Sequence, residues 1–133
     1  LYTMGSTVRG DTDIQADFEK FRSLPDNENK VDTLLNLAKS CWYQDPAFCI
    51  EIAKYGYSIS EQGNYRQKQA DALNIIGAGY YFMNQLDSAI HYFNQSLELC
   101  YSLDYKEGSA RVTNNLGLIY DYLGNYDRAI EYY

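Results

Sequence analysis

The chain repeats itself at an interval of 40 residues, and this period limits the folds open to it more than any other feature does. When residues 63–93 are aligned with residues 103–133 without a gap, nine positions are identical. A weaker copy precedes these two, because residues 34–38 match residues 73–77 at an offset of 39. Units copied in register along a chain indicate a linear array of one supersecondary structure.

Each copy begins with a predicted amphipathic helix. In the second copy this helix is expected from about Ala70 to Met83, where apolar residues recur at intervals of three and four. Asn84 in this copy and Gly124 in the next follow the helix, and both residue types tolerate the left-handed conformation at a helix end. A turn is therefore predicted at each of these positions.

A second helix is predicted after each turn. Asp87 and Asp127 are expected to be its N-caps in the second and third copies, because a carboxylate there accepts backbone N–H groups and faces the positive end of the helix dipole. In the first copy, Asp45 and Pro46 are expected to serve as N-cap and first helical residue. Each copy is therefore a helical hairpin.

Small residues at matching positions predict that the two helices of a hairpin lie close together. Gly77 and Gly117 fall in the middle of the first helix, where glycine costs about 1 kcal/mol relative to alanine. Ala89 and Ala129 fall early in the partner helix. The predicted core consists of the following residues: Leu34, Leu37, Ala38, Cys49, Leu73, Ile76, Gly77, Tyr80, Ala89, Phe93, Leu116, Gly117, Tyr120 and Ala129.

The pattern Leu73-x2-Ile76-Gly77-x2-Tyr80, followed by Ala89-x3-Phe93, resembles the tetratricopeptide repeat signature. Residues 113–133 resemble it as well. The resemblance implies an all-α fold, a right-handed α-solenoid of antiparallel helical hairpins with a concave face lined by the first helix of each repeat. A period of 40 residues, where about 34 is usual, is similar to the long-period repeats in the sensory regions of some bacterial histidine kinases.

The expected organisation has three parts. Residues 1–11 lack periodicity and are predicted to be a mobile segment, and residues 12–28 are predicted to be a capping helix with a linker. Three repeats are expected at about residues 29–63, 64–103 and 104–133. The last repeat ends part-way through a helix, so we expect the chain to be part of a longer array.

The inventory of reactive side chains predicts no enzyme, no metal site and no cofactor. His91 is the single histidine, and the equivalent positions in the other copies carry glutamate, so it is expected on a solvated face. Cys41, Cys49 and Cys100 lack metal-ligand spacing and are expected to be small buried residues. Gly77-Ala78-Gly79 lies inside a helix, which excludes a phosphate loop.

The net charge of −7 argues against nucleic acid and anionic membranes as partners. No apolar run reaches the roughly 18–20 residues that span a bilayer. The expected partner is a protein or peptide. The array is compatible with a cytoplasmic location, or with a periplasmic one where it is the sensory region of a membrane-bound kinase.

Two functions are consistent with this sequence. The first is a non-catalytic protein–protein interaction scaffold that binds a partner peptide or helix in the concave groove. The second is a sensory or regulatory region of a larger bacterial signalling protein, such as a two-component sensor histidine kinase. A homodimer through the C-terminal hairpin is also expected, because a terminal repeat leaves an apolar face uncovered.

The resemblance also implies which residues face the groove. These candidate partner-binding residues are Lys39, Trp42, Asn74, Tyr81, Arg111, Asn114 and Asp121. Trp42 and Tyr81 have the large, partly polar rings that often anchor partners. Packing between neighbouring repeats is an equally good explanation of these two rings.

Overall fold

A computed structural model describes residues 11–133, which form seven α-helices and no strand. The helices are α2 (Asp11–Arg22), α3 (Glu28–Ser40), α4 (Pro46–Gln62), α5 (Arg66–Phe82), α6 (Leu86–Ser102), α7 (Lys106–Tyr122) and α8 (Tyr126–Tyr132). The predicted mobile segment lies outside the described residues as far as residue 10, and α2 begins at Asp11.

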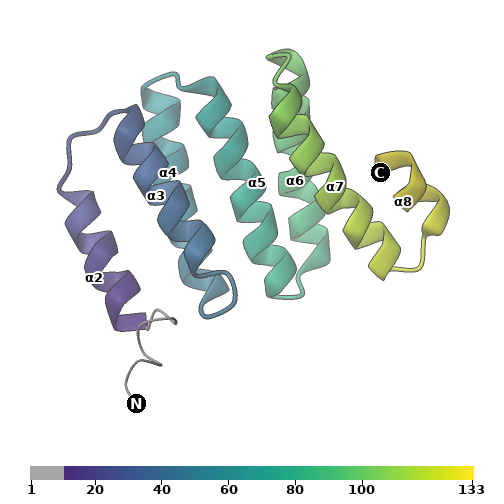
Figure 1. Cartoon of the computed structure of the whole chain (residues 1–133), viewed down its shortest axis with the longest axis horizontal. Coiled ribbons are helices and arrows are strands. Elements are labelled where there is room, and N and C mark those ends of the chain that lie inside the picture. The colour runs from purple at the N-terminus through teal and green to yellow at the C-terminus, as the bar shows by residue number, and fades with distance from the viewer. Residues whose placement is uncertain (1–10) are drawn as a thin grey trace.

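The helices form two layers (Figure 1). Helices α3, α5 and α7 lie side by side in one layer, and α4 and α6 lie behind them. Each helix contacts its neighbours in the chain, while α3 contacts α5 and α5 contacts α7. The predicted α-solenoid of antiparallel helical hairpins is confirmed.

The four turns that follow α4, α5, α6 and α7 share one geometry, in which a single residue takes a positive φ. This residue is Asn64, Asn84, Asp104 or Gly124, with φ between 53° and 77°. The next backbone N–H bonds back to the carbonyl five residues earlier, as in the 2.9 Å bond from Gln85 to Tyr80. The left-handed residue therefore reverses the chain without a long loop.

Two of the predicted helix starts are wrong, because this turn is shorter than expected. The N-cap positions are Gln85 and Asn125, two residues before the predicted Asp87 and Asp127. Both aspartates instead lie in the first turn of their helices, where they still face the positive end of the dipole. The predicted cap at Asp45 is confirmed, since its carboxylate accepts the Phe48 N–H at 3.0 Å.

The first helix of the second repeat also begins earlier than predicted, at Arg66 instead of about Ala70. Its first turn is polar and consists of strong helix formers, so it lacks the apolar periodicity that marked the rest. The added turn carries Lys68 to the concave face, which matters for the groove described below.

The close approach of paired helices is confirmed at Gly77. A Cβ atom built on this glycine would lie 2.7 Å from two ring carbons of Phe93 and 3.2 Å from the carbonyl oxygen of Ala89. A Cβ atom at Gly117 would lie 2.7 Å from the ring of Tyr133, which is exposed at the end of α8 and could shift. Gly77 is therefore the position at which packing excludes a side chain.

Twelve of the fourteen predicted core residues are buried, and the two exceptions are tyrosines. Tyr80 and Tyr120 are half-buried and stack on Tyr92 and Tyr132, with ring centroids 5.4 and 5.6 Å apart. A phenol ring contributes apolar area while its hydroxyl group stays hydrated, which favours the margin of the core over its centre.

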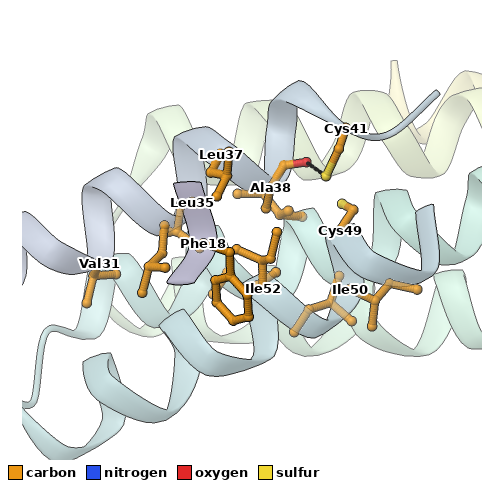
Figure 2. Packing of buried hydrophobic residues seen from close by; sticks show 14 of the residues in the cluster. Phe18, Val31, Leu35, Leu37, Ala38, Cys41, Cys49, Ile50 and Ile52 are labelled. Carbon is orange, nitrogen blue, oxygen red and sulfur yellow. Dashed lines mark hydrogen bonds between the residues drawn. The ribbon is translucent and has the colours of Figure 1, made fainter. Parts of the chain in front are cut away.

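All three cysteines are buried, as predicted, and none forms a disulfide with a described residue. Figure 2 shows the sulfur atoms of Cys41 and Cys49 turned toward one another within the core of the first hairpin, where the Cys41 thiol donates to the Ala38 carbonyl at 3.3 Å. The interaction with Cys41, together with burial, raises the pKa of Cys49 well above its ordinary range. A thiol in that state is a poor nucleophile.

A buried lysine fastens α2 to the array. The Lys30 ammonium group donates to the carbonyl oxygens of Arg22 at 2.8 Å and Leu24 at 2.9 Å, and to the Asp26 carboxylate at 2.7 Å. Burial alone would lower the pKa of Lys30, but its hydrogen bonds to Asp26 and Tyr55 raise it. Lys30 therefore caps the C-terminal end of α2 as a charged donor.

Candidate functional site

A concave groove of about 510 Å³ runs across the layer formed by α3, α5 and α7. Its lining comes from the same face of all three helices and from the turn after α3. The lining residues are Asp32, Leu35, Asn36, Lys39, Trp42, Lys68, Asp71, Asn74, Ile75, Arg111, Asn114 and Asn115.

Five of the seven candidate partner-binding residues line this groove, namely Lys39, Trp42, Asn74, Arg111 and Asn114. Tyr81 lines a smaller apolar pocket next to it. Asp121 lines neither cavity and is exposed near the end of α7. Asp121 therefore lies outside the described cavities, and its role in partner binding stays a prediction.

Arg111 is already engaged by its neighbours. Its guanidinium group donates to the Asp71 carboxylate at 3.2 Å and to the Tyr105 hydroxyl at 2.7 Å, and that hydroxyl donates to Asp71 at 2.9 Å. Burial, reinforced by Asp71, raises the pKa of Tyr105 to about 12. The triad joins α5 to α7 and fixes one end of the groove floor.

Two more polar contacts cross between neighbouring repeats. Lys68 pairs with Asp32 at 2.6 Å, and this contact raises the pKa of Lys68. The Asn115 amide donates to the Asn74 side-chain oxygen at 2.9 Å. Most polar groups of the groove floor are therefore used to hold α3, α5 and α7 together.

Lys39, Asn36 and Asn114 remain without a side-chain hydrogen bond or ion pair to any residue in the range 11–133. All three are exposed within the groove lining. A positive charge and two amides that can donate and accept are the groups left to meet a ligand.

Trp42 lies where the groove meets the apolar pocket and contributes to both. Its ring is half-buried and lies 5.9 Å from the Phe82 ring. It packs against the buried cluster around the first hairpin and against a second buried cluster that includes Phe93 and Leu116. Its indole nitrogen makes no hydrogen bond to the described residues. The Trp42 ring therefore packs between neighbouring repeats and is also accessible from the groove.

The sequence profile of a family described as "Tetratricopeptide repeat" matches residues 68–133. This range contains most of α5 and all of α6, α7 and α8. The chain belongs to the tetratricopeptide repeat family. No curated protein and no solved structure matches it significantly. Tetratricopeptide repeats generally mediate protein–protein interaction and are typically non-catalytic.

The reactive groups of this tetratricopeptide array are dispersed. His91 is exposed on α6, as predicted. Among residues 11–133, no group of three histidine, cysteine, aspartate or glutamate side chains could hold a metal ion. None of the described helices is long and apolar enough to cross a membrane.

Seven lining residues are not among the candidates named above. Asp32, Leu35 and Asp71 lie at concave positions that the resemblance implies, whereas the other four were missed for two reasons. Lys68 lies in the added first turn of α5, before the predicted helix start. Asn36, Ile75 and Asn115 occupy one equivalent place in three successive repeats, two residues before the central small residue. That place could have been found from the repeat register, since it recurs in the helix layer that lines the groove.

Proposed function

We propose that this chain is a non-catalytic interaction scaffold that binds an extended segment or a helix of a partner protein in its concave groove. The observation that carries the proposal is the groove lining, which leaves Lys39 and Asn114 free for a ligand beside the half-buried ring of Trp42. Aromatic anchors next to unpaired polar groups are typical of peptide-binding sites.

A random-peptide display selection tests the proposal. Selected peptides are expected to bind the parent chain and to lose at least tenfold in affinity, about 1.4 kcal/mol, to the double variant Lys39→Ala/Asn114→Ala. The matched control is Lys106→Ala/Asn94→Ala, which removes the same two residue types from exposed positions outside the groove. Peptides that bind parent and groove variant equally would place the binding surface elsewhere.

A second candidate function is a sensory or regulatory region of a larger bacterial signalling protein. The observation that favours it is the long repeat, since both helices of the second repeat contain 17 residues. The open reading frame around this chain decides between the two functions. A coiled coil followed by a kinase or helix-turn-helix sequence would support the signalling role, and further repeats alone would argue against it.

We also propose that two copies associate through the C-terminal hairpin. Ile130 and Tyr133 are 72% and 61% exposed, and Tyr122 and Leu123 add apolar surface nearby. Ile119 and Ala129 of the same hairpin lie outside this patch, because both are buried. Exposed large apolar side chains gathered on one terminal hairpin favour a self-complementary contact between two copies.

Light scattering at increasing concentration is expected to show the dimer. Ile130→Lys should shift the equilibrium to monomer, because a charge would then lie inside the contact. Ile130 is already solvated in the monomer, so the variant should fold normally. The dimer proposal fails if the unmodified chain stays monomeric at the highest concentration it tolerates.

A further inference from the structure

A small apolar pocket of about 150 Å³ adjoins the groove beside the end of α3. Ala78 and Tyr81 of α5 and Leu118 of α7 line it together with Trp42. In other proteins an apolar cavity of about this volume holds one benzene molecule. The pocket therefore has room for a single phenyl ring or branched aliphatic side chain.

The groove wall next to this pocket carries a cation, Lys39, that has no ion-pair partner among residues 11–133. Lys39 precedes Trp42 by three residues, and both line the groove. The other two cations of the lining, Lys68 and Arg111, are each held by an aspartate. Three cations against two carboxylates leave the lining with one net positive charge, although the whole chain has a net charge of −7.

A ligand inside the groove is affected more by the positive charge of the lining than by the negative net charge of the whole chain. At physiological salt the Debye length is about 8 Å, so exposed carboxylates elsewhere on the array are largely screened. A carboxylate that enters the groove meets Lys39 at short range, where screening is weakest. A basic side chain there would gain no free carboxylate, because Asp32 and Asp71 are already paired.

We propose that the ligand of this groove is a peptide segment in which a large apolar side chain lies next to a carboxylate. The apolar side chain occupies the pocket against Trp42, and the carboxylate pairs with Lys39. This inference rests on the proposed function, because it assigns a partner chemistry to the same groove.

Four capped tripeptides test the inference, all with blocked ends so that no terminal charge contributes. Their sequences are Asp-Phe-Asp, Asn-Phe-Asn, Asp-Ala-Asp and Lys-Phe-Lys. Trp42 is the only tryptophan, so its fluorescence and its indole resonance report binding at this place directly. We expect Asp-Phe-Asp to bind best, Asn-Phe-Asn about threefold more weakly, Asp-Ala-Asp at least tenfold more weakly, and Lys-Phe-Lys more weakly than Asn-Phe-Asn.

Two variants separate the charge from the apolar anchor. Lys39→Gln should abolish the difference between Asp-Phe-Asp and Asn-Phe-Asn, whereas the control Lys106→Gln should preserve it. Leu118→Gln should reduce the advantage of phenylalanine over alanine, because it places an amide in the pocket wall. Leu123→Gln is its control, since Leu123 is comparably exposed and lies outside the pocket.

The inference is overturned if Lys-Phe-Lys binds as well as Asp-Phe-Asp, if Lys39→Gln leaves the acidic preference intact, or if Trp42 responds to none of the peptides at millimolar concentration. Display-selected peptides that depend on Lys39 and Asn114 but lack an acidic–apolar pair would leave the groove function standing and remove this inference alone.

Discussion

Replacing Ala89 with leucine is expected to lower the free energy of unfolding by about 1–3 kcal/mol or more. Ala89 is fully buried, and its backbone forms the surface against which Gly77 packs. Alanine and leucine have similar helix propensities, so the cost reports packing and not backbone preference. Urea unfolding monitored by circular dichroism measures it.

Gly77→Leu tests the same contact from the other helix. The substitution gains about 0.8–1 kcal/mol of helix propensity, but the new Cβ atom would lie 2.7 Å from two carbons of the buried Phe93 ring and 3.2 Å from the Ala89 carbonyl oxygen. Overpacking is therefore expected to exceed the gain. Ala110→Leu, at an exposed position of α7, is the control and should change stability by less than about 0.5 kcal/mol. Equal melting of Ala89→Leu and the parent would refute the close-packing argument.

Replacing Lys30 with methionine is expected to destabilise the chain by about 2 kcal/mol, because the charged donor that binds the end of α2 is lost. Methionine keeps the apolar stem, so the change isolates the ammonium group. The cost should stay below that of a broken, fully buried ion pair, since the remaining Asp26 carboxylate is 58% exposed and can be hydrated.

Amide hydrogen exchange locates the effect of Lys30→Met. Protection of α2 should fall more than protection of α5 and α6. The control is Lys106→Met, which removes an exposed ammonium group from the start of α7. Unchanged protection of α2 would mean that Ile14 and Phe18, which are buried against the first repeat, hold the helix without the lysine.

The repeat register made the fold predictable from the sequence, because each apolar and small position could be checked against its copy. Gly77 and Gly117 illustrate this. A glycine in the middle of one helix could be a coincidence, but a glycine at the same place in two copies indicates that the helix packing requires a small residue there. The same register placed most of the groove lining. What it could not supply was the pairing of polar groups, such as Lys68 with Asp32, because those partners come from non-equivalent places in neighbouring repeats.

Lys30 was missed although the register held a signal for it. Its equivalent in the second repeat is Gln69, which is also buried and donates to the carbonyl oxygen of Ser60 at 3.2 Å. Both side chains therefore bind the C-terminal end of the preceding helix. A long polar residue recurring at one place just after a helix boundary is a pattern that hydrophobic periodicity alone does not detect.

The main contacts between the described helices join elements that are adjacent in sequence or one hairpin apart. Cooperative unfolding of the array therefore depends on the interfaces between neighbouring helices. A defect at the α5–α6 contact would divide the array into two blocks, each with fewer interfaces than it needs to stay folded. A defect at α2 would release one terminal unit and leave the others coupled. Substitutions of similar energetic cost should therefore differ in how many helices they unfold. A partner that binds across α3, α5 and α7 would stabilise the interfaces between neighbouring repeats, and with them the cooperativity of the whole array.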